Sequence, residues 1–251
     1  MVISKKYTKT IVIVGPTGSG KTGVGIEIAK EVGGEIISAD SRAIYKGMDI
    51  GTAKPSLEEQ DGVPHWGIDL VEPGERFTVA DWKAYAEQKI QEIRARGKVP
   101  MVVGGTGLYV DALVYNYQFT EEAKKSYADR KEIGTEFLMV GIKWTDVELR
   151  ERLVKRVNKL FNKDLYKEVK EVVKKHGWDN QAMKSIFYQF VWQYLRGECS
   201  LEEAKEKAVL GDWHLAKRQM TWFKRNPQIV WLKLAEIKPY VLKCIQDEQR
   251  K

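Results

Sequence analysis

The 251-residue sequence lacks what several classes of protein require. Its two cysteines, Cys199 and Cys244, are too few for a disulfide framework or a four-cysteine zinc site, and they suit a reducing, cytoplasmic setting. The three histidines, His65, His176 and His214, lack the spacing of metal ligands, so we expect structural roles for them. No apolar run approaches the length of a membrane span, and no apolar stretch of the kind found in secretion signals follows the lysine-bearing start. We therefore expect no membrane segment and no signal peptide.

Positive and negative charge are unevenly distributed between the two halves of the chain. The net charge is +7, but residues 1–136 carry 18 Lys/Arg against 20 Asp/Glu, whereas residues 137–251 carry 24 against 15. A basic C-terminal half favours a polyanionic partner. Solvated helix faces would produce the same balance, so the charge alone leaves both interpretations open.

A phosphate-binding pattern lies near the start of the chain. The stretch GPTGSGKT fits G-x-x-x-x-G-K-[ST], and it stands between an apolar run and a helical pattern, as such a loop requires. Its glycines let backbone N–H groups point at an anion, Lys21 adds a positive charge, and the hydroxyl of Thr22 can ligate Mg²⁺. The predicted phosphate-binding residues are Gly15, Pro16, Thr17, Gly18, Ser19, Gly20, Lys21 and Thr22. The motif is typical of nucleotide-binding, ATP-binding proteins, but it would hold a diphosphate as well. A glycine-rich turn without a ligand is the alternative.

Apolar runs alternate with helical patterns along the chain. This alternation predicts an α/β fold, a P-loop NTPase-like parallel sheet flanked by helices, with a helical C-terminal half. Strands are expected at 10–14, 35–38, 67–70, 99–103, 137–142 and 229–232. Helices are expected at 23–31, 79–96, 107–113, 147–160, 163–175, 183–195 and 201–225. Because no interdomain linker is evident, we expect a single domain over 1–251, with a minimal insertion at about 116–136.

Polar residues follow two of the predicted strands. Asp40 and Ser41 come after the second strand, and Thr106 ends a Gly-Gly-Thr turn after the fourth. Ligands of open α/β sheets bind at the carboxyl edge, so these residues are candidates for the site. Asp40 could instead cap a helix or close a turn, and Thr106 could cap the next helix. An ATPase or GTPase normally has an acidic residue where the Gly-Gly-Thr turn stands, which weakens a nucleoside-triphosphatase interpretation.

Five stretches together resemble the tRNA dimethylallyltransferases, also called tRNA isopentenyltransferases. They are GPTGSGKT (15–22), SADSRAIYKGMDIGTAKP (38–55), VPHWGIDLVEP (63–73), PMVVGGTGLY (100–109) and LAKRQMTWF (215–223). The resemblance covers most of 10–115 and 143–232, and the second and fifth stretches are far more specific than the phosphate-binding loop.

The resemblance implies a prenyl transfer. The donor would be dimethylallyl diphosphate, the acceptor the exocyclic amine of the adenosine 3′-adjacent to the anticodon in tRNA, and the leaving group pyrophosphate. The loop would then hold the donor diphosphate, with Mg²⁺ at Thr22. By similarity the catalytic residues are Asp40, Thr106 and Arg156: Asp40 as the acceptor of a hydrogen bond from the amine and its base, Thr106 near the bridging oxygen or the base, and Arg156 as a cation for the diphosphate. Contacts to tRNA are expected from Asp40, Ser41, Arg42, Ala43, Lys217 and Arg218. We expect a monomer that binds the anticodon stem-loop.

Several positions depart from the family pattern. Asp212-Trp213-His214 stands where the family has threonine-arginine-glutamine, Phe187 where it has glycine, and Ala43 where it has glutamine. The insertion is also much shorter than in most members. These departures put individual RNA or phosphate contacts and the grip on the anticodon stem in doubt, while the phosphate-binding loop, Asp40 and Thr106 match.

Other functions fit parts of the same sequence. An enzyme that prenylates free adenine nucleotides would use the same loop and the same Asp40. A small-molecule kinase and an inactive RNA-binding relative are further alternatives. The basic C-terminal half and the LAKRQMTWF segment favour tRNA. Within that segment, Trp222 and Phe223 are expected to be core residues rather than platforms for a base.

Overall fold

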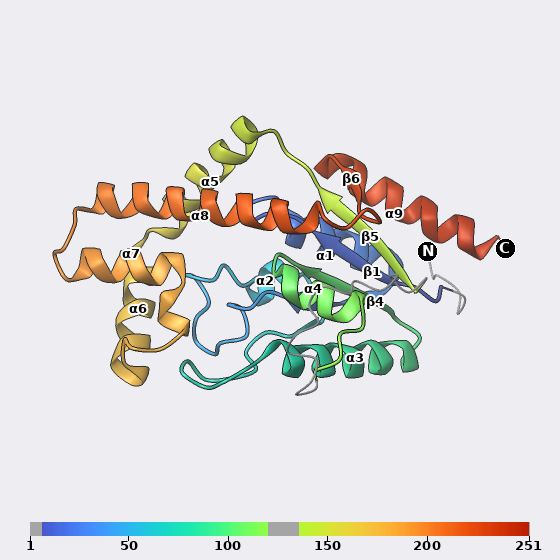
Figure 1. The fold of residues 1–251 in the computed structure, drawn as a ribbon, viewed down its shortest axis with the longest axis horizontal. Helices are drawn as coiled ribbons and strands as arrows, with labels where there is room; N and C mark the ends of the chain where they lie inside the picture. The colour runs from blue at the N-terminus through green and yellow to red at the C-terminus, as the bar shows by residue number, and fades with distance from the viewer. Residues whose placement is uncertain (1–6, 120–135, 251) are drawn as a thin grey trace.

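A parallel β-sheet forms the centre of the computed structural model, which describes residues 7–119 and 136–250 (Figure 1). The described strands are all parallel and lie in the order β3-β2-β4-β1-β5-β6. Their bounds are Thr10–Val14 (β1), Gly34–Ala39 (β2), His65–Trp66 (β3), Val99–Gly104 (β4), Phe137–Ile142 (β5) and Val230–Leu232 (β6). The inner strands are rich in Val, Ile and Met and are buried, as strands covered on both faces must be. The expected parallel sheet is confirmed.

Helices cover both faces of this sheet and also form a separate layer at one end. Their bounds are Lys21–Val32 (α1), Leu57–Gln60 (α2), Val79–Ala95 (α3), Gly107–Val114 (α4), Asp146–Leu160 (α5), Lys163–His176 (α6), Ile186–Leu195 (α7), Leu201–Phe223 (α8) and Leu234–Gln249 (α9), with a 3₁₀ turn at Ala182–Lys184 (η2). One face packs against α3 and α4, and the other against α1 and α9. Among the described helices, none combines the length and the apolar character that crossing a membrane requires.

Two elements differ from the sequence-based expectation. The strand expected at 67–70 is wrong: β3 is His65–Trp66, and the chain then bends at Gly67, whose φ is 79°. A Cβ there would lie 2.9 Å from the carbonyl oxygen of Ser38, so this close approach needs glycine. The helix expected at 183–195 is interrupted by Ser185, whose backbone is extended between η2 and α7. Helices α2 and α9 were not expected.

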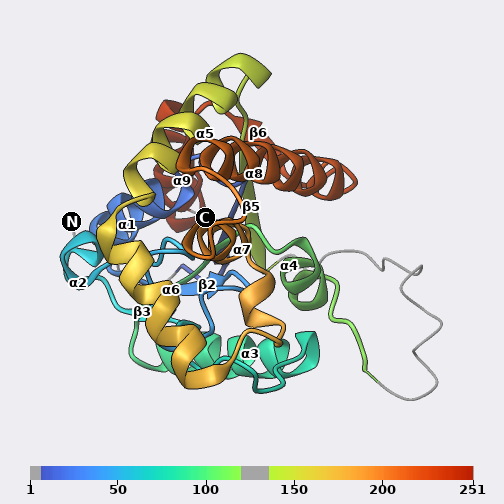
Figure 2. The ribbon, with the colours of Figure 1, turned by 90° about the vertical axis from the view of Figure 1, so that its left-hand side faces the viewer.

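A third apolar cluster lies within the helical end of the molecule. It joins the end of α5 with α6, α7 and the first half of α8, and it also buries Ile44, Tyr45 and Met48 from the loop after β2. Figure 2 shows α6 and α7 in front of the sheet from this end. Helix α8, about 34 Å long at 1.5 Å per residue, runs from this cluster to the sheet, where Phe223 is buried. The helical C-terminal half is thereby packed on the loop that follows β2.

The carboxyl ends of β1, β2 and β4 meet at one edge of the sheet. The chain continues from β1 into α1 on one face of the sheet, and from the neighbouring β4 into α4 on the other face. Open α/β sheets bind ligands where neighbouring connections diverge in this way. Gly104 is in register with Ala39 on one side and Val14 on the other. The segment 116–136 lies outside the described residues except for 116–119 and 136, so the minimal insertion and the single-domain assignment stay predictions.

The close approach of β2 and β4 gives a stability prediction. A Cβ on Gly104 would lie 2.2 Å from the carbonyl oxygen of Ala39, a backbone atom that cannot move without disturbing the sheet. Gly104→Ala is therefore expected to lower the free energy of unfolding by about 3 kcal/mol. Gly23→Ala is the control, because a Cβ at this helical glycine meets nothing within 4 Å. It should raise stability by up to about 1 kcal/mol. Urea unfolding followed by circular dichroism measures both, and equal stabilities of the two variants would contradict the prediction.

Candidate active site

The loop between β1 and α1 presents backbone N–H groups at the sheet edge. Gly18 and Gly20 have φ of 73° and 90°, values that side-chain-bearing residues rarely adopt. The first N–H groups of a helix have no intrahelical acceptor. Gly20, the N-cap of α1, has no side chain that could accept from them. Together with the partial positive charge of the helix start, they form a site for an anion.

Four hydrogen bonds with side chains hold backbone groups of this loop. Arg152 Nε donates to the carbonyl of Gly18 at 2.8 Å, and Trp144 Nε1 donates to that of Ser19 at 3.0 Å. Lys21 Nζ donates to the carbonyl of Pro16 at 3.1 Å. The amide of Thr17 donates to Gln219 Oε1 at 2.8 Å. Side chains from outside the loop, on α5 and α8 among others, therefore fix its conformation.

A cavity of about 380 Å³ opens beside the loop. Its walls come from the phosphate-binding loop, the loops after β2 and β4, and helices α5, α7 and α8. The structure brings eight of the residues expected from the sequence to this cavity: Thr17, Lys21, Asp40, Ser41, Arg42, Thr106, Arg156 and Arg218. The catalytic candidates and the cations of the loop therefore share one space.

The remaining candidates lie elsewhere. Gly15, Pro16 and Ser19 are buried within the loop, Gly18 and Gly20 are partly exposed there, and Thr22 is exposed at the start of α1. Ala43 is buried, with its carbonyl accepting from the amide of Asp69.

Lys217 lies on a different face of α8 from the cavity. It is exposed, its Nζ is 2.8 Å from Asp146 Oδ2, and it lies over the ring of Trp213. The side chains of Ala43 and Lys217 are thus absent from the cavity wall.

Asp40, Ser41 and Thr106 are joined by short polar contacts. Thr106 Oγ1 accepts from the amide of Ser41 at 2.9 Å and donates to Ser41 Oγ at 3.3 Å, while its own amide donates to the carbonyl of Ala39. Thr106 is the N-cap of α4, but its side chain makes no cap bond. Asp40 Oδ1 accepts from the amide of Arg42 at 2.8 Å, a turn-type bond that occupies one carboxylate oxygen. The Gly-Gly-Thr turn therefore holds the loop that carries Asp40.

Among the charged residues that line the cavity, Lys21, Arg156, Asp40 and Asp212 interact with one another. Burial lowers the pKa of Lys21 to about 8, with Asp40 opposing this shift and Arg156 adding to it. The Nη1 of Arg156 donates to Thr17 Oγ1 at 2.9 Å and to Asp212 Oδ2 at 2.5 Å. Burial raises the pKa of Asp212, and the positive charge of Arg156 opposes the rise. At neutral pH Lys21 stays charged beside the loop.

The sequence-based reasoning missed three residues of this site. Asp212 and Phe187, both singled out only as departures from a pattern, contact Arg156: Asp212 through the ion pair and Phe187 through its ring, 5.0 Å from the guanidinium carbon. Gln219 bridges the amide of Thr17 and the carbonyl of Gly105. A signal for Asp212 was present, because it interrupts a row of small residues spaced by four along α8: Ala204, Ala208, Asp212 and Ala216, all of them buried.

Trp222 and Phe223, at the end of α8, both pack against the core of the sheet. Phe223 is buried in the core beneath the sheet. Trp222 is half-buried, packs against the same core, and donates from Nε1 to Asp111 Oδ2 at 2.9 Å. A Cβ on Gly107 would lie 2.2 Å from its ring. Phe223 is therefore a core residue, as expected, whereas Trp222 packs on the core and also lines the cavity.

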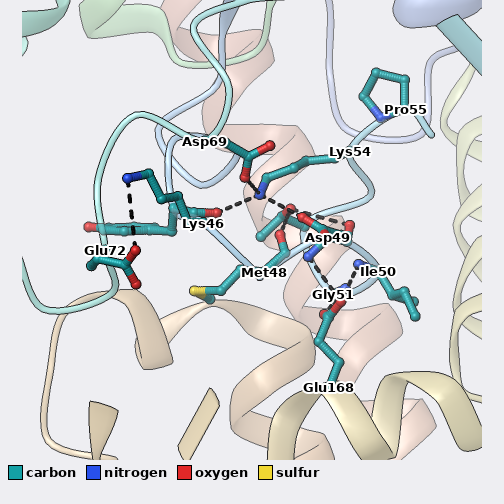
Figure 3. Close-up of polar contacts among 12 residues, drawn as sticks. Lys46, Met48, Asp49, Ile50, Gly51, Lys54, Pro55, Asp69, Glu72 and Glu168 are labelled. Atoms are coloured by element: carbon teal, nitrogen blue, oxygen red, sulfur yellow. Dashed lines mark hydrogen bonds and ion pairs between the residues drawn. The ribbon is translucent and has the colours of Figure 1, made fainter. Parts of the chain in front are cut away.

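The loop of residues 48–54 forms a wall of the cavity through Gly51 and Thr52. Two opposite charges hold this loop (Figure 3). The buried ammonium of Lys54 donates to the carbonyl of Tyr45, to Asp49 and to Asp69, at 2.5, 2.7 and 2.5 Å.

On its other side the loop is held by the carboxylate of Glu168. This side chain accepts from the amides of Asp49, Ile50 and Gly51 at 3.0, 2.8 and 2.9 Å. It also accepts from the hydroxyl of Tyr188 at 2.6 Å. Helix α6 therefore anchors the loop through one carboxylate and three loop amides, and Tyr188 of α7 donates to the same carboxylate.

The four donors around Glu168 yield a matched pair of variants. Glu168→Gln replaces two acceptor oxygens by one and turns an amide donor toward N–H groups, which should cost about 1–3 kcal/mol of unfolding free energy. Glu171→Gln, one turn further along α6, loses only an exposed contact to Lys167 at 3.8 Å and should be nearly neutral. Chemical denaturation measures the difference, and a Glu168→Gln protein as stable as Glu171→Gln would show that the loop is held by other contacts.

Comparison with known proteins shows to which family this chain belongs. The model described as IPP transferase matches residues 43–136 and 121–226, and the model described as isopentenyl transferase matches residues 8–68. The tRNA dimethylallyltransferase of Acetivibrio thermocellus is 38% identical over 284 aligned positions, covering 88% of this chain and 90% of that protein. This alignment is longer than the 251 residues of the chain, so it contains gaps in this chain.

Solved structures agree. The tRNA isopentenylpyrophosphate transferase from Bacillus halodurans superposes with a TM-score of 0.83 at 30% identity, covering 97% of this chain and 98% of that one. The tRNA delta(2)-isopentenylpyrophosphate transferase from Staphylococcus epidermidis does so with a TM-score of 0.83 at 32% identity, covering 95% and 99%. With its sequence, its fold and its phosphate-binding loop in agreement, the chain belongs to the tRNA dimethylallyltransferase family of prenyltransferases.

Proposed function

We propose that this protein transfers the dimethylallyl group of dimethylallyl diphosphate to the exocyclic amine of the adenosine 3′-adjacent to the anticodon in tRNA, releasing pyrophosphate. One observation carries the proposal: an anion-binding loop and the carboxylate of Asp40 line the same cavity. The loop supplies a place for the diphosphate, and Asp40 supplies a base for the nucleophile.

The first requirement of the reaction is to stabilise the departing pyrophosphate. As the allylic C–O bond breaks, negative charge grows on the diphosphate, and donors aimed at that charge lower the barrier. The amides at the start of α1, the ammonium of Lys21 and the guanidinium of Arg156 are such donors. Because the pKa of Lys21 is about 8, its ammonium is present at neutral pH and is lost as the pH rises past that value.

Magnesium fits this site as a partner of the donor. The described part of the chain contains no group of three or more His, Cys, Asp or Glu side chains able to hold a metal ion. Mg²⁺ commonly binds through phosphate oxygens and retained waters with few protein ligands. The exposed hydroxyl of Thr22, next to Lys21, is the residue that would hold it. Bound there, the ion would neutralise part of the diphosphate charge.

The second requirement is to activate the adenosine amine, which is a weak nucleophile. Asp40 would accept a hydrogen bond from this amine and take its proton as the new C–N bond forms. One of its oxygens is held by the amide of Arg42, and a carboxylate retains further acceptor positions. Thr106 fixes the neighbouring Ser41 and thereby the direction of the loop. The base then follows β2 and the leaving-group site follows β1, and both strands end at the same edge of the sheet.

The acceptor has to enter the cavity as an unstacked base. Enzymes that modify a base in a structured RNA flip it out, and single-stranded loops are the usual targets. Arg42 and Arg218 line the cavity and would contact RNA phosphates near the flipped base, with Ser41 beside Asp40. A monomeric, cytoplasmic enzyme of one domain remains part of the proposal; the free cysteines Cys199 and Cys244 fit the reducing compartment but do not bear on the oligomeric state.

A competition assay tests this function. The protein is incubated with dimethylallyl diphosphate and Mg²⁺ while unmodified tRNA and AMP are offered together, and the prenylated nucleoside is identified by mass spectrometry. We expect dimethylallyl-adenosine in tRNA, at the position after the anticodon. Prenylated AMP alone would assign the chain to free nucleotides. ATP turnover without a prenyl donor would point to a kinase, and RNA binding without product to an inactive relative.

Substitution of Asp40 is expected to slow the chemical step while leaving the binding of pyrophosphate nearly unchanged. Asp40→Asn keeps the shape but removes the base, so turnover should fall about 10²–10⁴-fold, while the affinity for pyrophosphate stays within a few-fold of the unmodified protein. Ser41→Ala is the control, because it loses one 3.3 Å contact to Thr106 and leaves the carboxylate in place. Its turnover should fall less than about tenfold. An Asp40→Asn protein with more than half of the original rate would remove Asp40 from the mechanism.

A further inference from the structure

Two ion pairs connect helices α5 and α8, and they differ in where they lie. Asp146 and Lys217 form the outer pair, with side chains 67% and 50% exposed. Arg156 and Asp212 form the inner pair, and Asp212 is only 2% exposed. The inner pair lines the cavity beside the phosphate-binding loop, whereas the outer pair does not. The same two helices thus carry a buried pair in the site and an exposed pair outside it.

The guanidinium of Arg156 is already engaged. Its Nη1 binds both Thr17 Oγ1 of the loop and Asp212 Oδ2, and the ring of Phe187 lies 5.0 Å from its central carbon. The carboxylate of Asp212 is a negative charge of the protein itself, and it lies where the site has to bind the negatively charged diphosphate. A carboxylate this deeply buried is tolerated because Arg156 compensates its charge.

A diphosphate in the loop changes that balance. It brings more negative charge than Asp212 and attracts the same guanidinium, so two anions then face one arginine. An ionised Asp212 left beside the diphosphate would be repelled by it and poorly solvated. Protonation of the carboxyl removes the repulsion and leaves a neutral group that can donate a hydrogen bond.

We propose that Asp212 sets the affinity of this site for the donor diphosphate, competing with it for Arg156 and binding a proton when the diphosphate takes the guanidinium. This inference rests on the proposed function of the loop as the diphosphate site. Asp212 is thereby an affinity-determining residue for the donor, distinct from Asp40, which serves the acceptor.

The charged groups around Asp212 support the sign of this coupling. Lys21 from α1 and Arg156 from α5 favour its ionised form, Asp40 after β2 interacts with the same Lys21, and Arg42 and Arg218 line the same cavity. From α7 the neighbouring lining residues Ser185, Ile186 and Phe187 carry no charge. Burial already raises the pKa of Asp212. Taking Arg156 away raises this pKa further, so a proton is bound with the diphosphate and binding weakens as the pH rises.

Inorganic pyrophosphate is the probe for the experiment. Its dissociation constant is measured by calorimetry from about pH 5.5 to 7.0, where most of Lys21 remains charged, for the unmodified protein, Asp212→Asn and Asp146→Asn. Coupling to one proton changes affinity by up to about tenfold per pH unit. We expect the unmodified protein and Asp146→Asn to lose affinity with rising pH more steeply than Asp212→Asn. At pH 7.0 Asp212→Asn should bind at least about tenfold tighter than either. Titration of pyrophosphate itself is common to all three proteins.

Each other outcome overturns the proposal in a recognisable way. Equal affinity and equal pH slope for Asp212→Asn and the unmodified protein would show that Asp212 only joins two helices. Weaker binding by Asp212→Asn would show that Asp212 positions Arg156 for the ligand instead of competing with it. Absence of binding by all three proteins would reject the diphosphate site itself, and with it the proposed function. If circular dichroism shows that Asp212→Asn is unfolded, Asp212→Ser takes its place in the same measurement.

Discussion

The hydrogen bonds that hold the phosphate-binding loop from outside are the constraint on which the rest of the structure depends. Buried backbone groups have to be paired. The loop pairs the carbonyl of Pro16 itself, with the amide of Ser19 and the ammonium of Lys21, whereas other groups find their partners outside the loop. The carbonyl of Gly18 is satisfied by Arg152, that of Ser19 by Trp144, and the amide of Thr17 by Gln219. The loop's shape is therefore set partly by the helical half of the chain, more than 120 residues away in sequence.

This constraint explains why α5 and α8 lie across the sheet edge. Helix α5 carries Arg152 and Arg156 one turn apart, and both contact the loop. Helix α8 carries Gln219, which contacts the loop, and two turns before it Asp212, which contacts Arg156 of α5. The long α8 also packs in the helical cluster at one end and against the sheet at the other. Helical half and sheet consequently share one polar centre, and the cavity lies where they meet.

A second network holds the opposite wall. Glu168 pairs with three successive amides and Lys54 with two carboxylates, so the loop of residues 48–54 is fixed by one charge of each sign. Hydrogen bonds to charged groups are stronger than neutral ones, and several on one loop restrict it cooperatively. Both walls of the cavity are thereby formed before a ligand enters.

The sequence predicts the elements well because local patterns decide them. Apolar runs predicted five of the strands to within about a residue, and the glycine spacing predicted the loop. The expected strand at 67–70 failed because its apolar residues follow Gly67, where a positive φ and the carbonyl of Ser38 impose a bend.

Contacts between residues that are far apart in the sequence could not be predicted from local patterns. Gln219 and Thr17 are 202 positions apart, and nothing local in either segment announces their contact. The side of α8 on which a residue lies is easier to predict. Asp212, Leu215, Gln219 and Trp222 recur every three or four residues and line the cavity, whereas Lys217 falls about 140° around the helix from Asp212. Motif membership suggested Lys217 as a ligand contact, but helical periodicity alone would have placed it on another face.

The central claim is that the loop holds the diphosphate of the prenyl donor. The most direct measurement varies dimethylallyl diphosphate at saturating tRNA for the unmodified protein and for Lys21→Ala. Lys21 contacts the donor both in the ground state and as charge develops, so the account predicts a higher donor KM together with a lower kcat, at least tenfold in kcat/KM or about 1.4 kcal/mol, and an unchanged KM for tRNA. Donor kinetics that do not change would contradict a diphosphate in this loop.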